Sequence, residues 1–273
     1  MAGSIGRIVG ARACALTGFG MMATLVLAGG AQAQSPDTTS TTAPKAVVEL
    51  FTSQGCSSCP PADKLISDMT AKRPDVIALT LAVDYWDYLG WKDTLAKHGH
   101  SMRQKAYARL RGDGRMFTPQ VVVNGVAMAV GSDGPAVETA VQSAVPPSVP
   151  VALAVTEGKL AVGVGAGSAS GEVWLCPLAS SVTVAIGRGE NEGKQVTYHN
   201  VVRRWVKLGD WNGAAAQFET PVAAFMADGI DAVAVLVQRG TPGTPGAIVG
   251  AGVMALPKEE TAKFPPAPAS PTP

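Results

Sequence analysis

The sequence has little charge and few histidines, and each shortage argues against a class of protein. Charged residues make up 16% of the 273 residues, and the formal net charge is only +1. Such a chain lacks the positive field with which proteins attract nucleic acid or anionic membrane surfaces. We therefore expect no nucleic-acid partner. With three histidines in all, the chain also has little material for a histidine-rich metal site.

Long apolar runs are also missing, except at the N-terminus. Residues 1–33 carry Arg7 and Arg12, then an apolar run, then Ala31-Gln32-Ala33, which is the pattern of a secretory signal peptide. Glycines interrupt the run, which is short for a membrane span. We interpret residues 1–33 as a signal peptide, with an uncleaved membrane anchor as the alternative. The mature chain is then expected to have no membrane span and to be periplasmic or secreted.

Cysteine is scarce too, and two of the four cysteines lie three residues apart. Cys14 lies within the predicted signal, which leaves Cys56, Cys59 and Cys176. An oxidising compartment lets disulfides persist. A chain of this length can bury its own core without cross-links, so a general need for stability does not explain the close pair. Cys176, in the apolar run EVWLCPL, is predicted to be a small buried residue.

Composition divides the rest of the chain into four segments. Residues 34–44 form a linker rich in Ser, Thr and Pro, and residues 45–146 alternate strand and helix patterns. Residues 149–257 consist almost entirely of short strand patterns separated by glycine-rich turns, which predicts an all-β, sandwich-like accessory domain. The Pro-rich residues 258–273 are expected to form an unfolded tail.

The segment 45–146 is predicted to be an α/β domain with the order β-α-β-α-β-β-α. Its signals are apolar runs for the strands, helical periodicity, an Asn-Gly hairpin turn, and proline or glycine at helix ends. In chain order they are the strand Val47 to Phe51, a helix from Ala62 that ends before Pro74, the strand Val76 to Val83, a helix started by Ser101 and Gln104 and stopped by Gly112, two strands about Asn124-Gly125, and a helix opened by Pro135.

The close cysteine pair lies where the first strand leads into the first helix. Cys56 is predicted at or near the helix N-cap and Cys59 in the first turn. Free backbone N–H groups and the positive end of the helix dipole would favour a thiolate there, and the thiolate is the reactive form of cysteine. Ser57 and Ser58 can add hydroxyl donors.

This arrangement of strand, Cys-x-x-Cys, proline and helix resembles thioredoxin. The stretch FTPQVVVNG (Phe117 to Gly125) resembles the threonine–proline turn of that fold. The resemblance implies that residues 45–146 form a thioredoxin-like domain, with a cis Thr118–Pro119 peptide facing the cysteines. The chain departs from thioredoxin in having Ser-Ser between the cysteines and no tryptophan before the first.

Over about residues 46–255 the chain is more similar to one family of secreted bacterial proteins, the domain of unknown function 1223 family. The motifs that carry this similarity are VELFTSQGCSSCPPAD, VDYWDYLGWKD, RQKAYA, TPQVVVNG, GRGEN and HNVVR.

The leading functional hypothesis is thiol–disulfide exchange with exported protein thiols or disulfides, together with a redox partner. Cys56 would form the mixed disulfide and Cys59 would resolve it. Thr118 and Pro119 would hold the bound segment through main-chain contacts, and no cofactor would be required.

Three alternatives to that hypothesis stay open. The cysteines, with His98 and His100, could handle copper or zinc. The domain could be a non-catalytic binding module, or the cysteines could form a structural disulfide.

Three further segments have no assigned chemistry. Arg103, Gln104 and Tyr107 are interpreted as a solvated helix face. The stretch VDYWDYLGW either packs as an aromatic loop or lines a cleft beside the cysteines. The stretch GRGENEGK either recognises a partner or packs on the cysteines.

Overall fold

The computed structural model describes residues 39–40, 43–227 and 229–264. The predicted signal peptide, most of the predicted linker and residues 265–273 of the predicted tail lie outside these ranges. Within them, no helix combines the length and the apolar character needed to cross a bilayer.

Strands dominate the described residues, and four α-helices accompany them there. The strands are β1 (Thr39–Ser40), β2 (Ala46–Thr52), β3 (Val76–Ala82), β4 (Gln120–Val123), β5 (Ala127–Val130), β6 (Val151–Thr156), β7 (Lys159–Val164), β8 (Gly171–Ala185), β9 (Gln195–Val202), β10 (Val206–Trp211), β11 (Ala216–Pro221), β12 (Ala232–Thr241) and β13 (Thr244–Ala255). The helices are α1 (Pro60–Lys72), α2 (His98–Arg111), α3 (Gly134–Ser143) and α4 (Lys258–Ala262), with short 3-10 turns at Asp87–Leu89 and Val222–Ala224.

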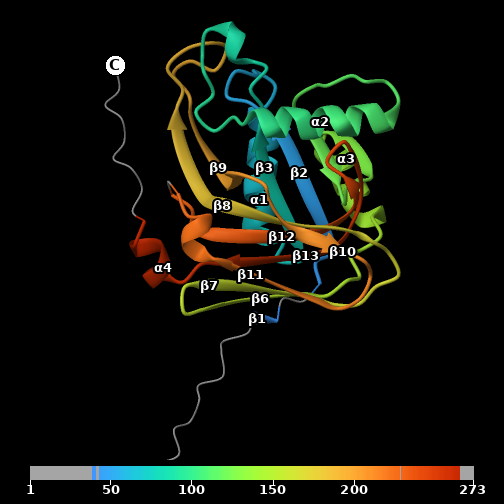
Figure 1. The fold of residues 1–273 in the computed structure, drawn as a ribbon. Coiled ribbons are helices and arrows are strands. Elements are labelled where there is room, and N and C mark those ends of the chain that lie inside the picture. Colours follow the sequence, from blue (N-terminus) through green and yellow to red (C-terminus); the bar gives the residue numbers. More distant parts are fainter. Residues whose placement is uncertain (1–38, 41–42, 228, 265–273) are drawn as a thin grey trace, which may run out of the picture. The chain divides into compact units, whose positions relative to one another are not determined.

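Most of the strands join one mixed sheet of nine strands. Its order is β13-β12-β8-β9-β3-β2-β4-β5, and β10 pairs with β8 off this path. The neighbours β2 and β3 are parallel, as are β3 and β9, whereas the other pairs in the sheet are antiparallel. A smaller sheet has the order β1-β6-β7-β11. Figure 1 shows β6, β7 and β11 as a second layer beside β12 and β13.

The prediction of a thioredoxin-like βαβαββα domain followed by a separate β sandwich is wrong. Strands expected in the accessory domain continue the sheet that contains β2, because β9 pairs with β3 at Thr80 and Val201. The Thr80 hydroxyl donates to the His199 carbonyl over 2.7 Å, and the Asn200 amide donates to the Ala78 carbonyl over 3.0 Å. An alternating apolar pattern predicts a strand and its buried face. It does not predict which other strand will pair with it.

Both faces of the β2–β3 pair are covered, which explains their continuous apolar sequences. Every residue of both strands is buried, as expected for parallel strands with packing on each face. Helices α1 and α3 share a core with one face, which includes Val48, Leu50 and Ile66. On the other face, the Tyr107 ring of α2 packs edge-on against Phe51, with ring centroids 6.2 Å apart.

A second apolar core lies between the small sheet and the strands β8, β10 and β12. Leu153 and Val162 of the small sheet contribute to it, together with Val235 of β12 and Trp211 of β10. Phe264, just beyond α4, packs against this core. The described start of the predicted tail therefore carries a short helix, followed by one side chain that packs on this core.

The ends of α1 and α2 follow local chemistry. Helix α1 begins at Pro60, where a missing N–H is tolerated because first-turn N–H groups have no intrahelical partner. Helix α2 begins at His98, one turn before the predicted start, because the Ser101 hydroxyl donates to Asp84 instead of capping the helix. The helix ends at Gly112 in the left-handed conformation (φ 92°), as glycine permits.

Candidate active site at the Cys56–Cys59 disulfide

Cys56 and Cys59 form a disulfide in the loop between β2 and α1, with their Cα atoms 5.4 Å apart. Both cysteines are buried, whereas Ser57 and Ser58 between them are exposed. The Ser58 hydroxyl oxygen lies 3.5 Å from the Cys56 sulfur. Cys59 rather than Cys56 is the N-cap residue of α1, so the helix dipole acts mainly on the second cysteine.

A buried carboxyl group lies one helical turn after the disulfide. The Asp63 amide donates to the Cys59 carbonyl over 3.1 Å, and the Thr52 hydroxyl donates to the Asp63 carboxyl over 2.7 Å. Burial, with a smaller contribution from Asp93, raises the pKa of Asp63 to about 7. The carboxyl therefore exchanges its proton near neutral pH, within one turn of a cysteine.

The segment after β3 holds the strand end that leads to the cysteines. Asp93 accepts the Gln54 amide over 2.8 Å, and its other oxygen accepts the amides of Leu95 and Ala96. The Trp91 indole donates to the Gln54 side chain over 2.8 Å. Part of the predicted aromatic segment therefore packs on the loop that carries the cysteines.

Trp86 connects the cysteine loop to the threonine–proline turn. Its indole N–H donates to the Thr118 hydroxyl over 2.8 Å. Its Cβ lies 3.2 Å from the position that a Cβ on Gly55 would take. A larger residue at position 55, just before Cys56, would therefore require Trp86 to move slightly. The sequence motif VDYWDYLGW therefore has a definite place beside the cysteines.

The Thr118–Pro119 peptide is cis, as the sequence predicts, and it lies beside the first turn of α1. Gly131 marks the contact: a Cβ there would stand 3.1 Å from Pro119 and 3.2 Å from Ala62. Ala62 is the third residue after Cys59. The fold thus brings the Thr118–Pro119 turn close to the helical turn that follows Cys59.

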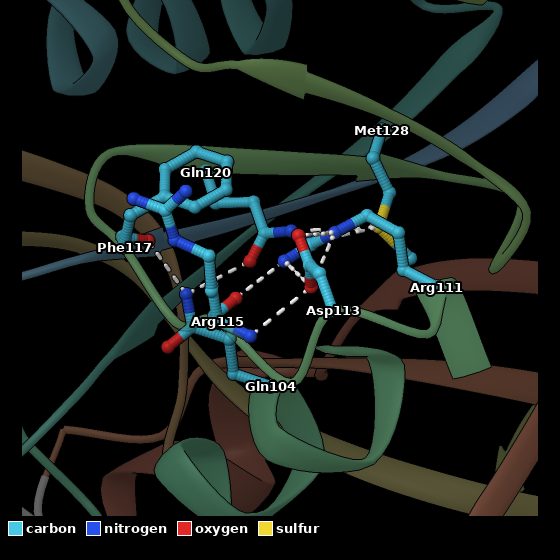
Figure 2. Close-up of polar contacts among 7 residues, drawn as sticks. All are labelled: Gln104, Arg111, Asp113, Arg115, Phe117, Gln120 and Met128. Carbon is cyan, nitrogen blue, oxygen red and sulfur yellow. Dashed lines mark hydrogen bonds and ion pairs between the residues drawn. The ribbon is translucent and has the colours of Figure 1, made fainter. Parts of the chain in front are cut away.

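Side chains from α2 hold the residues on either side of the Thr118–Pro119 turn, Phe117 and Gln120 (Figure 2). The Gln104 amide donates to the Phe117 carbonyl over 2.7 Å and to the Gln120 side chain over 2.9 Å. Arg111 pairs with Asp113 and also donates to the loop backbone. Buried Gln104 therefore sets the position of the residue before Thr118, a role that its polar character did not reveal.

The loop joining β8 to β9 packs on the cysteine loop. The Asn191 amide donates to the carbonyls of Gln54 and Cys56, over 2.9 Å each. The Glu190 carboxylate accepts the Ser57 amide over 3.3 Å. The loops after β2 and β3 and the β8–β9 loop gather at the same end of the large sheet in Figure 1. Of the two roles that the sequence left open for this loop, the structure shows packing on the loop that contains Cys56.

The two histidines of the metal alternative each have their own hydrogen-bond partner. His98 is exposed and bonds Asp84 over 2.9 Å, whereas buried His100 bonds the Ala82 carbonyl over 2.9 Å. Burial lowers the pKa of His100 to about 4. Across residues 43–227 and 229–264, no three His, Cys, Asp or Glu side chains are grouped to hold a metal ion. Cys176 is buried as predicted, and burial raises the pKa of its thiol.

The predicted solvated face of α2 is wrong, because its polar residues form a buried network. Arg103 donates to Glu49 over 2.6 Å and to the Gln238 side chain over 2.8 Å. The Tyr107 hydroxyl donates to Glu49 over 2.7 Å, and Gln104 is fully buried. The signal that could have revealed this is the single carboxylate in the apolar strand AVVELFT, which needs a buried cationic partner.

Comparison with known proteins places the chain in a family. A family model described as protein of unknown function (DUF1223) matches residues 47–238. The chain belongs to the DUF1223 family. The DUF1223 match contains both cysteines, the Thr118–Pro119 turn and the β8–β9 loop, and it ends within β12, before β13.

A crystal structure of an Agrobacterium tumefaciens protein is similar, with 33% sequence identity and a TM-score of 0.70. The alignment covers 78% of this DUF1223 chain and 95% of that chain. A structure of HBP35 from Porphyromonas gingivalis is 13% identical, with 85% and 80% of the two chains covered and a TM-score of 0.47. Among curated proteins, none matches.

Proposed function

We propose that this protein is an exported thiol–disulfide oxidoreductase, periplasmic or secreted, that acts on the thiols or disulfides of other exported proteins. The observation that carries the proposal is the disulfide between Cys56 and Cys59, which has a hydroxyl group and an ionisable carboxyl group nearby. A serine hydroxyl lies 3.5 Å from one sulfur, and the carboxyl of Asp63 lies one helical turn beyond the other cysteine.

The exchange proceeds in two balanced steps. A substrate thiolate attacks Cys56, the Cys56–Cys59 bond breaks, and Cys59 leaves as a thiolate. A second substrate thiolate then attacks the mixed disulfide and releases Cys56. The substrate loses two electrons and gains a disulfide, and the cysteine pair gains the same two electrons. A dithiol–disulfide redox partner returns the pair to its starting state, and the reverse sequence reduces a substrate disulfide.

Asp63 and the threonine–proline turn have supporting roles in this proposal. A carboxyl with a pKa of about 7 is suited to give a proton to the departing Cys59 thiolate and to take it back in the reverse direction. The Thr118–Pro119 main chain, beside the first turn of α1, would hold an extended substrate segment. Because the β8–β9 loop covers Cys56, substrate entry requires this loop to move.

A purely structural disulfide explains the arrangement less well. A cross-link stabilises a protein mainly by constraining the unfolded chain, and the effect grows with the length of the closed loop. Cys56 and Cys59 are separated by only three positions in sequence. The entropy formula gives about 2 kcal/mol for so short a ring, against about 4.7 kcal/mol for a 100-residue loop.

The test is a trapping experiment with three cysteine variants. In Cys59→Ser the mixed disulfide has no internal route of release, so complexes with exported proteins should accumulate on non-reducing gels and disappear with reductant. Cys56→Ser should trap far less, and Cys176→Ser, which removes a buried thiol, should behave as wild type. Empty lanes for Cys59→Ser would refute the exchange. Lower stability in both variants without trapping would indicate a structural disulfide, and equal loss of bound copper or zinc would indicate metal handling.

A further inference from the structure

An apolar groove lies between α2, strands β8 and β12, and the turn that joins β12 to β13. Its volume is about 350 Å³, within the usual range of about 300–1,000 Å³ for small-molecule sites. The rings of Trp174 and Trp205 lie 6.4 Å apart and nearly perpendicular, at 75°. Met102, which is 46% exposed, and Ala106 line the groove from the α2 side.

A fixed guanidinium group also lines this groove. The Arg103 guanidinium stacks on the Trp205 ring at 4.2 Å. Its Nε donates to Glu49, and its Nη2 donates to Tyr107 and Gln238. The remaining nitrogen, Nη1, contacts no acceptor in the described part of the chain. Because its other donors are held by three buried partners, Arg103 offers Nη1 in a fixed orientation.

Two more arginines at the groove are free to bind an anion. Arg109 and Arg239 are exposed, and neither has an ion pair with any residue the structure describes. Glu172 is the only acidic residue among those that line the groove, and its charge is compensated. It accepts Lys207 over 2.6 Å and the Trp174 indole over 3.2 Å. The groove is therefore lined both by aromatic rings and by arginine side chains that can bind an anion.

Trp205 has no polar anchor of its own. Its indole N–H is buried and lacks a hydrogen-bond partner among the described residues. The ring is held by the stack with Arg103 and by the contact with Trp174. Buried polar groups without a hydrogen-bond partner are rare in folded proteins, and they occur at functional sites.

We propose that this groove binds a small aromatic carboxylate. The aromatic body would lie against Trp174 and Trp205, where flat apolar surfaces and ring edges are available. The carboxylate would accept hydrogen bonds from Arg103 Nη1 and pair with Arg109 and Arg239, because guanidinium groups match a planar carboxylate. The site is separate from the disulfide and does not rest on the redox function proposed above.

The test compares a charged and a neutral probe of the same size by isothermal titration calorimetry on the full chain. 2-Naphthoate should bind with a dissociation constant below about 1 mM, and naphthalene-2-methanol should bind three- to tenfold more weakly. In Arg109→Gln/Arg239→Gln this preference should fall without disappearing, because Arg103 Nη1 still binds the carboxylate, and binding of the alcohol should be unchanged. Met102→Glu, at an exposed position, should weaken naphthoate binding further than alcohol binding.

A charge-matched control completes the experiment. Lys105→Gln/Arg115→Gln also removes two positive charges, one on α2 and one in the following loop. Both positions are exposed, and neither lines the groove. This variant should bind naphthoate within twofold of the wild-type protein. Equal affinity for acid and alcohol in the wild-type protein, or an equal loss in both double variants, would overturn the proposal. Circular dichroism of each variant checks that the fold is retained.

Discussion

The buried carboxyl of Asp63 makes the stability of this protein depend on pH in a defined way. Its pKa is raised from 3.8 to about 7 in the folded state, chiefly by burial, whereas the unfolded chain should keep an ordinary value of about 3.9. The difference is about three pKa units at about 1.4 kcal/mol each. Ionising Asp63 in the folded protein therefore costs about 4 kcal/mol more than ionising it in the unfolded chain.

The sign follows from which state holds the proton. Below pH 4 both states are protonated, and the group's stabilising contribution is fully present. Between pH 4 and 7 the unfolded chain has lost its proton while the folded protein keeps it, so each added pH unit lowers the free energy of unfolding by about 1.4 kcal/mol. Above pH 7 both states are ionised, and the whole contribution is lost.

The Asp63→Asn variant isolates this effect, because its side-chain oxygen can still accept the Thr52 hydroxyl but cannot ionise. Urea unfolding of both proteins, followed by tryptophan fluorescence from pH 4 to 8, should show the wild-type protein losing about 4 kcal/mol relative to the variant. Other titrating groups, such as Asp93, are present in both proteins and largely cancel. Parallel stability curves across this range would refute the reasoning.

Thr52→Val supplies a second check. The Thr52 hydroxyl hydrogen bond lowers the pKa of Asp63 against the larger effect of burial. Without it, the upper end of the pH window should move to higher pH, and an unchanged window would show that the hydroxyl does not act on the carboxyl.

Three other predictions concern particular contacts. Glu49→Gln leaves the Arg103 charge buried without its carboxylate and should lower the free energy of unfolding by about 3–5 kcal/mol in urea titrations; a loss below 1 kcal/mol would contradict a buried pair. Replacing both Cys56 and Cys59 by serine should cost only about 2 kcal/mol, and a loss above 4 kcal/mol would mark a structural cross-link. Asn191→Ala removes two buried hydrogen bonds to the cysteine loop and should speed reduction of the disulfide by dithiothreitol at least tenfold; an unchanged rate would show that the loop does not limit access.

Features that depend on residues close together in the sequence could be predicted. The Asn124-Gly125 turn is one: both residues have positive φ, 49° and 71°, in the tight turn between β4 and β5. The continuous apolar run from Val76 correctly indicated a strand buried on both faces. The cysteine pair and the Thr118–Pro119 turn were found as motifs, and the fold places them side by side.

Features that depend on distant partners could not be predicted. The partner of Arg103, Glu49, is 54 positions away, so the helix pattern alone made Arg103 look like a surface residue. Asn191 reaches Cys56 over 135 positions, in a turn whose polar composition is typical of any exposed loop. The pairing of β3 with β9 decides the architecture, and it leaves no local signature in either strand.

The position of β3 between β2 and β9 has a consequence for the order of synthesis. The strand is complete at Ala82, but its second neighbour begins only at Gln195. While the ribosome makes the intervening chain, one edge of this largely apolar strand, which is fully buried in the folded protein, has no partner, and unpaired strand edges of this kind promote aggregation. The large sheet must therefore close late, and a chain that stopped at residue 146 should be produced but recovered as insoluble protein.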